Sequence, residues 1–437
     1  MLVYDMADPA MQQTVAGTPQ IKTMQTSFAF SDKEIETLKT LAKQVAEVAY
    51  LPIQEEKAKL WTAHNDLKTT RPLIFIDPEN GWNEIIPPLV CTDPLARVWE
   101  MYFRKQLYWF YTLKDDKVIV PHFDVSYSYG DNGWGLDITK VGGEQGGAYK
   151  VKQALEDYER DLEYLRYPVI EIDHAQSDRV MALAQELFGE ILQVRRKNTW
   201  WWTLGMCHDF INLRGLEDFM CDLVAEPEQF HAVMELFTQG QLKRLDWLER
   251  EGLLSLNNDA AYVGSGGFGF TQELPAAGFD GSKVRTIDMW GFVEAQETVS
   301  ISPEMYAEFV LPYHIRMTER FGLNCYGCCE VYDTRWQYIQ TIPRLRRVSV
   351  SAWADWKTVP AYLGKNYIAS MKLSPTPLAS STMNEDVVRA DCRRAVEETK
   401  GGICEFIMKD NHTLGGSPQN AARWVEIMRE EIEKGYA

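Results

Sequence analysis

The sequence predicts an α/β fold and, within that class, a (β/α)8 TIM barrel with an N-terminal helical extension. In about the last 150 of the 437 residues, five short apolar runs typical of buried strands each precede a stretch with helical spacing. None of the connections carries the turn residues of a hairpin, so the strands are expected to lie parallel, with crossover helices between them. The repetition, and the room upstream for further units, favour a closed barrel over a doubly wound sheet.

The first 115 residues are predicted to form a loose arm followed by the helical extension. Ser31 and Glu34 have the spacing of a capping box, and apolar residues then recur at helical spacing until Pro52 closes the segment. Asp93 and Pro94 provide the N-cap and the first-turn proline of a second helix. The aromatic side chains of this second helix are expected to pack in the core.

The predicted barrel spans residues 116–437 and begins with a short strand at 118–121. Its clearest strands are expected at 287–293, 323–327, 347–352, 367–373 and 403–408. The helices of the barrel are expected at 228–251, 303–320, 334–341, 357–364, 384–399 and 418–434. Because the active sites of such barrels lie at the carboxyl ends of the strands, functional residues are expected in the loops that follow them.

The composition excludes several classes of function. Lysine and arginine number 45 against 63 aspartates and glutamates, a net charge of −18, which disfavours nucleic acids and anionic membranes as partners. No apolar run is long enough to span a bilayer, and the first residues lack the pattern of a signal peptide. The eight cysteines are too sparse for a disulfide scaffold. We therefore expect a cytoplasmic protein.

The strongest local signal is a cluster of three cysteines around the end of the strand predicted at 323–327. Cys325 and Cys328 have Cys-x2-Cys spacing, which suits two thiolates bound to one soft metal ion. A second such pair is absent from the sequence, which favours an open metal site over a closed structural one. A third ligand could come from Glu330 or from His412, after the last strand. A thiol redox pair and inert buried cysteines are the alternative interpretations.

Two other features lie near predicted strand ends. Trp290 and Trp353 could line a pocket for a flat ligand. The segment 264–269 formally matches G-x-G-x-x-G, but no helix can open at its third glycine, so it is predicted to be a flexible active-site loop instead of a dinucleotide site.

Together these motifs resemble the uroporphyrinogen decarboxylase superfamily, and within it the branch of corrinoid-protein-dependent methyltransferases, as O-demethylase methyltransferase components. The resemblance covers roughly residues 90–435. It is clearest at 213–217, 290–297, 301–304, 324–330 and 403–424. The family fold that it implies is the (β/α)8 barrel with a helical N-terminal extension.

The sequence departs from the family pattern in two places. Decarboxylases carry an N-terminal Met-Arg-Gln-Ala-Gly-Arg motif that binds the tetrapyrrole carboxylates, whereas residues 71–77 read Arg-Pro-Leu-Ile-Phe-Ile-Asp. The methyltransferase branch usually binds zinc through His-x-Cys after one strand and a cysteine after the last strand. Here Cys325 and Cys328 stand at the first place and His412 at the second. The resemblance therefore implies zinc, held by these three residues.

The activity that the resemblance implies is methyl transfer between a heteroatom and the cobalt of a separate corrinoid protein, with zinc as a Lewis acid. The aromatic-rich strand ends favour a methoxylated aromatic as the methyl donor, and a thiol acceptor is the other direction. Glu297 and Glu330 are expected to orient a water or hold a substrate hydroxyl. The residues expected to contact substrate are Trp290, Gln296, Tyr326, Trp353 and Asn411.

Two other classes of function stay open. A tetrapyrrole decarboxylase would need several arginines at the barrel mouth and no metal. A non-enzymatic binding protein would need only a filled ligand site and structural cysteines. Beside the corrinoid protein, a second copy of the chain is a possible partner, as a homodimer.

Overall fold

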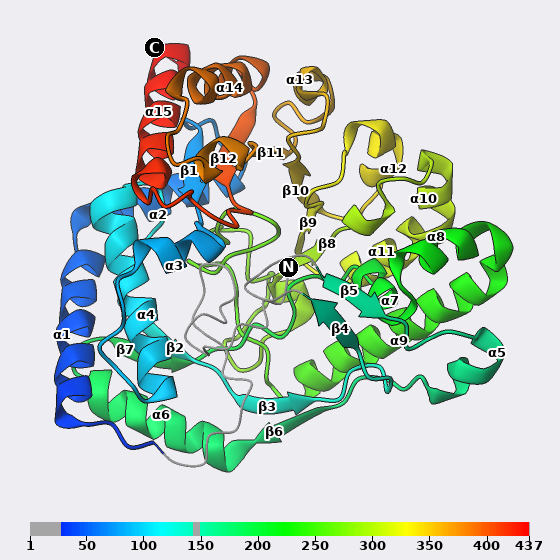
Figure 1. Ribbon diagram of the computed structural model, residues 1–437, viewed down its shortest axis with the longest axis horizontal. Helices are drawn as coiled ribbons and strands as arrows, with labels where there is room; N and C mark the ends of the chain where they lie inside the picture. Colours follow the sequence, from blue (N-terminus) through cyan, green and yellow to red (C-terminus); the bar gives the residue numbers. More distant parts are fainter. Residues whose placement is uncertain (1–27, 143–148, 437) are drawn as a thin grey trace.

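The computed structural model describes residues 28–142 and 149–436, and its main feature is a parallel sheet of six strands (Figure 1). The sheet has the order β1-β12-β11-β10-β9-β8, and every neighbouring pair is parallel. Its strands are β1 (Leu73–Ile76), β8 (Trp290–Val293), β9 (Leu323–Tyr326), β10 (Leu345–Val350), β11 (Ile368–Lys372) and β12 (Ile403–Met408). The predicted α/β class and parallel sheet are confirmed.

Three smaller sheets complete the strand content of the described residues. Two further strands, β2 (His122–Val125) and β7 (Gln193–Arg196), pair in parallel. The pairs β3 (Ser128–Asp131) with β6 (Ile170–Asp173) and β4 (Thr139–Gly142) with β5 (Tyr149–Lys152) are antiparallel. In the described part of the chain, no strand ladder joins the six-stranded sheet to β2 and β7. The closed barrel predicted from the sequence is therefore not observed as one continuous sheet.

The six strands read as apolar runs because both faces of the sheet are covered. All residues of β1, β8, β9, β11 and β12 are buried, as expected for a parallel sheet packed on two sides. The five strands predicted after residue 287 are all present. The sheet also includes β1, which the predicted domain boundary assigns to the helical extension. The strand predicted at 118–121 lies instead at 122–125, because pairing with β7 begins at the Pro121 carbonyl, which accepts from Gln193 N.

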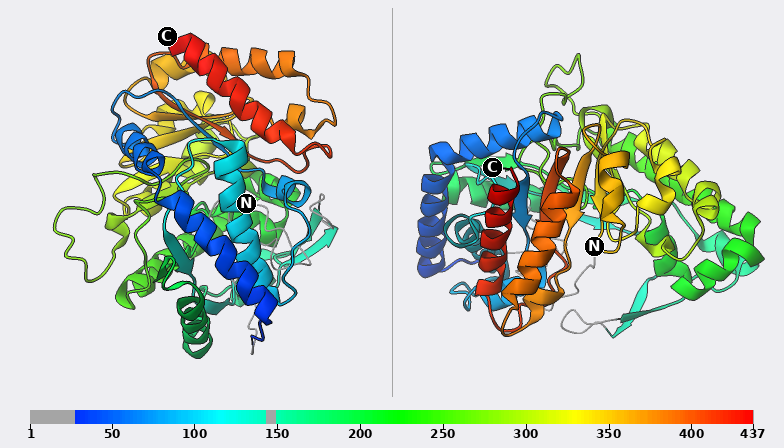
Figure 2. Two further views of the ribbon diagram at one scale, coloured as in Figure 1. Left: turned by 90° about the vertical axis from the view of Figure 1, so that its left-hand side faces the viewer. Right: turned by 90° about the horizontal axis from the view of Figure 1, so that it is seen from above.

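Helices surround the sheets, and α14 and α15 pack on each other beside β1 (Figures 1 and 2). In the first half they are α1 (Asp32–Ala49), α2 (Pro52–Asn65), α3 (Trp82–Ile85), α4 (Pro94–Tyr108), α5 (Tyr158–Asp161), α6 (His174–Phe188), α7 (Cys207–Arg214), α8 (Leu216–Ala225) and α9 (Pro227–Arg250). In the second half they are α10 (Pro303–Phe309), α11 (Leu311–Thr318), α12 (Trp336–Ile339), α13 (Val359–Tyr362), α14 (Glu385–Glu398) and α15 (Gln419–Tyr436). None of these helices is both long and apolar enough to cross a membrane.

Prolines explain two differences from the predicted helices. The capping box of Ser31 and Glu34 is present. Pro52, expected to close this segment, instead occupies the first turn of α2, where the missing amide hydrogen costs nothing. The helix predicted at 303–320 is divided at Val310, because Pro312 cannot donate the hydrogen bond that would continue it.

The glycine-rich segment predicted to be a flexible loop is buried, and it packs against strands of the six-stranded sheet. Residues 263–269 are all buried, and the Phe268 carbonyl accepts a hydrogen bond from Asn65 Nδ2 of α2 at 2.7 Å. A Cβ atom at Gly264 would lie 2.7 Å from Cys325 Cβ. The prediction of a flexible loop is therefore wrong: the glycines allow the backbone to pass close to the strands.

Candidate functional site

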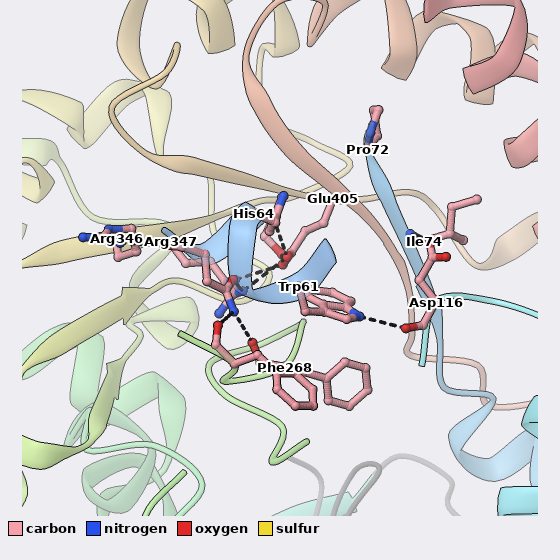
Figure 3. Close-up of polar contacts among 12 residues, drawn as sticks. Trp61, His64, Pro72, Ile74, Asp116, Phe268, Arg346, Arg347 and Glu405 are labelled. Atoms are coloured by element: carbon pink, nitrogen blue, oxygen red, sulfur yellow. Dashed lines mark hydrogen bonds and ion pairs between the residues drawn. The ribbon is translucent and has the colours of Figure 1, made fainter. Parts of the chain in front are cut away.

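A network of buried charged side chains joins strands β10 and β12 to helix α2 (Figure 3). Glu405 of β12 has its Oε1 atom 3.0 Å from Arg347 Nε of β10 and its Oε2 atom 3.1 Å from His64 Nε2 of α2. All three side chains are buried. Burial would raise the pKa of Glu405, but the charge of Arg347 and the hydrogen bond from His64 outweigh it and hold the pKa at about 2. Glu405 is thus an ionised carboxylate in the interior.

The network extends toward the carboxyl ends of the strands through β11. Ser370 Oγ donates to Glu405 Oε1 at 2.6 Å, and Lys372 Nζ donates to Ser370 Oγ at 2.6 Å. Burial lowers the pKa of Lys372 to about 8. Cys325 belongs to this interior layer, because its Sγ atom lies 3.7 Å from Arg347 Nη1.

Cys328 lies at the carboxyl edge of the sheet, in a separate cluster. Its Sγ atom accepts from Ser265 Oγ at 3.2 Å and lies 3.8 Å from Lys409 Nζ and 3.7 Å from Cys329 Sγ. The hydrogen bond from Cys329, together with the charge of Lys409, outweighs burial and lowers the pKa of Cys328 to about 5. The hydrogen bond from Cys329 and the buried ammonium group of Lys409 thus favour the thiolate form of Cys328.

The structure does not bring together the three predicted zinc ligands. Cys325 faces Arg347, Cys328 faces Ser265 and Lys409, and His412 is exposed. Within residues 28–142 and 149–436, no group of three or more histidine, cysteine, aspartate or glutamate side chains is arranged to hold a metal ion. In this structure Cys325, Cys328 and His412 are therefore not arranged as one common ligand set.

The two predicted catalytic glutamates have different surroundings. Glu330 is buried, and its two carboxylate oxygens accept from the backbone amides of Ala295 at 2.8 Å and Cys328 at 2.7 Å. It joins the end of β8 to the cysteine segment, and burial raises its pKa to about 7. Glu297 has its Oε1 atom 3.3 Å from His208 Nδ1, while its buried Oε2 atom has no hydrogen-bond partner among the described residues. A carboxylate in this position orients the imidazole.

A large cavity opens beside this histidine–glutamate pair. It has a volume of about 1260 Å³, and its wall includes His208, Glu297, Gln296 and Cys329. Three exposed apolar residues also line it: Trp353 is 73% exposed, Leu216 53% and Val299 52%. We call it the outer cavity.

A second cavity, of about 740 Å³, lies against β2, β3 and the segments after β7. We call it the aromatic cavity, because its wall includes Tyr129, Trp134, Trp200, Trp201, Trp202 and Tyr262. His208 lines both cavities. Gly264 also lines the aromatic cavity, and the next residue, Ser265, donates to Cys328. The cysteine segment thus contributes Cys329 to the wall of the outer cavity, and Cys328 contacts Ser265, the neighbour of a residue of the aromatic cavity.

The five residues predicted to contact substrate divide into two groups. Gln296 and Trp353 line the outer cavity. Trp290, Tyr326 and Asn411 are buried and belong to neither described cavity. Trp290 Nε1 donates to the Gly269 carbonyl at 2.9 Å, and Asn411 Nδ2 lies 3.3 Å from the Asp77 carbonyl, so both support the fold.

The sequence did not single out His208 as a site residue. It also did not place residues 200–202 on the wall of a cavity. The run of three tryptophans is visible in the sequence, but such residues are more often core than ligand platform. His208 follows no predicted barrel strand and is placed by α7. Only the packing of α7 beside the 3-10 turn Gln296–Thr298 joins His208 to Glu297.

Comparisons with known proteins give a distant likeness only. No family model matches the chain, and no curated protein matches it either. The solved structures that are similar include a methyltransferase from Methanosarcina mazei, with a TM-score of 0.42 and 12% sequence identity over 98% of this chain and 97% of that chain. A likeness at this level carries no argument about function, which has to rest on the site itself.

Proposed function

We propose that the chain is a methyltransferase that moves the methyl group of a methoxylated aromatic compound to the corrinoid cofactor of a partner protein. The observation that carries the proposal is the pair of cavities that share His208, the first of which also has Cys329 in its wall. A transfer between two reactants needs two such spaces on either side of one reacting centre, whereas a decarboxylase of one substrate needs only one.

The pair of His208 and Glu297 supplies the acid that ether cleavage requires. A phenolate is a poor leaving group at neutral pH, so the departing aryl oxygen gains from a proton delivered as the bond to the methyl carbon breaks. The electron pair of that bond stays on the oxygen, and the proton comes from the imidazole, which Glu297 orients at 3.3 Å. The corrinoid, when its protein is docked, supplies the nucleophile that accepts the methyl group.

The outer cavity suits the approach of the partner protein. Its exposed apolar residues, Leu216, Val299 and Trp353, would be covered in a complex. Its volume of about 1260 Å³ leaves room for a large flat cofactor. The aromatic cavity, on the other side of His208, is left for the methyl donor.

Three finer predictions from the sequence belong to this proposal. The first is that the strands close into a (β/α)8 barrel. The second is that the chain binds zinc. A zinc content of about one per chain that falls in Cys328→Ala but persists in Cys404→Ala would support zinc, and a metal-free protein would contradict it. The corrinoid partner is the third. No step of the mechanism depends on zinc.

The tetrapyrrole decarboxylase alternative finds little support in the site. Arg71, which stands where decarboxylases carry their arginine motif, is held by Asp116 through two hydrogen bonds of 2.9 and 2.6 Å. It lines neither of the two cavities described here.

The test is release of catechol from guaiacol (2-methoxyphenol) with chemically reduced cobalamin as the methyl acceptor. We expect His208→Ala to lower the rate by about 100-fold or more, the usual loss of a general acid. His174→Ala, at an exposed position of α6 that lines neither cavity, is the matched control and should retain the wild-type rate. Equal rates in the two variants would remove His208 from the mechanism.

A further inference from the structure

We infer that Lys117 is an imine-forming lysine, whose amine reacts with the carbonyl group of a small apolar aldehyde in the aromatic cavity. The side chain lines this cavity, although only 3% of its surface is exposed. The inference goes beyond the proposed function, because imine formation needs neither a corrinoid nor His208.

Two aromatic rings hold the amine of Lys117. Its Nζ atom lies 4.6 Å from the ring centroid of Trp109 and 4.9 Å from that of Phe268. Trp109 is fixed through its Nε1 atom, which donates to the Ile76 carbonyl at 2.8 Å. The Phe268 ring packs edge-on against Trp61, with ring centroids 5.2 Å apart (Figure 3). Because both rings are held in place, they keep the amine in one position at the cavity wall.

No carboxylate in the described part of the chain forms an ion pair with Lys117. Burial disfavours its charge, and this effect exceeds the attraction of Asp115 and Asp77, which act from a greater distance. Lys57 also disfavours the charge, and the pKa of Lys117 falls to about 8. At pH 7 this pKa raises the share of uncharged amine more than about 100-fold over that of an ordinary lysine. The uncharged amine is the nucleophile that imine formation requires.

Other buried lysines do not combine these properties. Burial also lowers the pKa of Lys105 and of Lys372 to about 8. Neither of them lines one of the two described cavities. Lys197 does line the aromatic cavity, but it forms an ion pair with Asp259 at 2.7 Å. Of these four lysines, only Lys117 both lines a cavity and makes no ion pair.

The reaction is a condensation that releases water. The uncharged nitrogen of Lys117 adds to the carbonyl carbon with its free electron pair, and the carbonyl oxygen takes up a proton. The resulting hydroxyl group leaves with a second proton as water, while the nitrogen forms a double bond to the carbon. The two protons on the water balance the two that the nitrogen loses. One amine and one aldehyde thus give one imine and one water, without an oxidant or a reductant.

The cavity favours an apolar body on the aldehyde. Its volume is about 740 Å³, and aromatic side chains form much of its wall. Trp200 packs against Tyr129 with ring centroids 4.9 Å apart, and Trp134 packs against Phe237 at 4.3 Å. Such held rings present rigid apolar faces to a ligand. Benzaldehyde is therefore a suitable probe of the site.

Reductive labelling of the full chain with benzaldehyde and cyanoborohydride at pH 7, followed by mass spectrometry of its peptides, tests the inference. The reductant converts an imine into a stable benzylamine, which marks the lysine that formed it. We expect at least about tenfold more label on Lys117 than on Lys105 or Lys372, or on exposed lysines such as Lys150. Lys117→Met, which keeps an unbranched side chain, should lose this label and retain the low labelling of Lys150.

The inference is overturned if Lys117 carries no label, or if Lys105, Lys372 or Lys150 is labelled as strongly. The wild-type chain alone decides this outcome, so it does not depend on the folding of Lys117→Met. Label on Lys117 in a chain that releases no catechol would uphold the imine site and refute only the methyltransferase proposal. Catechol release by a chain whose Lys117 stays unlabelled would refute the imine site and leave that proposal standing.

Discussion

Replacement of Glu405 by glutamine should destabilise the chain by about 3–5 kcal/mol at pH 7. The pKa of Glu405 is lowered from its usual 4.5 to about 2, and one pKa unit corresponds to about 1.4 kcal/mol, so the ionised carboxylate contributes about 3 kcal/mol. Removing one partner of a buried ion pair costs a similar amount, about 3–5 kcal/mol, because Arg347 is left uncompensated. The side chain is fully buried, so solvent screening is small.

Urea unfolding at several pH values measures this difference. A lowered pKa in the folded state stabilises the protein above pH 4.5, and that stabilisation disappears as the pH falls toward 2. The gap between wild type and Glu405→Gln should therefore be full at pH 7 and shrink below pH 4.5. Glu397→Gln, on the exposed face of α14, is the control and should change stability by less than about 0.5 kcal/mol. A difference for Glu405→Gln below about 1 kcal/mol, or one that is independent of pH, would refute the network.

Three further predictions concern the site. Glu297→Gln should lower the rate of catechol release by about tenfold or more with guaiacol binding unchanged; an unchanged rate would separate Glu297 from the reaction. Lys409→Met should raise the pKa of the Cys328 thiol from about 5, as followed by thiolate absorbance, because a neighbouring positive charge is lost; an unshifted titration would show that Lys409 does not stabilise the thiolate. Trp353→Ala should slow transfer to a corrinoid protein but not to free cobalamin; equal effects on both would argue against docking at the outer cavity.

The C-terminal strands can be predicted from the sequence because a parallel strand buried on both faces reads as a continuous apolar run. Residues 403–408 are all buried in β12, and the expected bounds agree with the observed ones. Strand β1 is fully buried, like β12, but it is only four residues long and lies between helices in the sequence. Its place in the sheet depends on pairing with β12, more than 300 residues later, which no local pattern reports.

The candidate site is only partly predictable for a similar reason. The cysteine segment and Glu297 are visible because they follow apolar strands. Cys325 and Cys328 have the spacing of metal ligands, but Gly327 turns the chain between them with a φ of +88°. One sulfur therefore contacts Arg347 inside the sheet, and the other contacts Ser265 and Lys409 at its edge. The role of His208 depends on tertiary packing alone.

Transfer of an isotopically labelled methyl group from guaiacol to reduced cobalamin tests the central claim most directly. The proposed function predicts labelled methylcobalamin and an equal amount of catechol, formed by the wild-type chain and at least about 100-fold more slowly by His208→Ala. A folded wild-type chain that binds guaiacol, yet forms neither labelled product above the rate without protein, would contradict the claim.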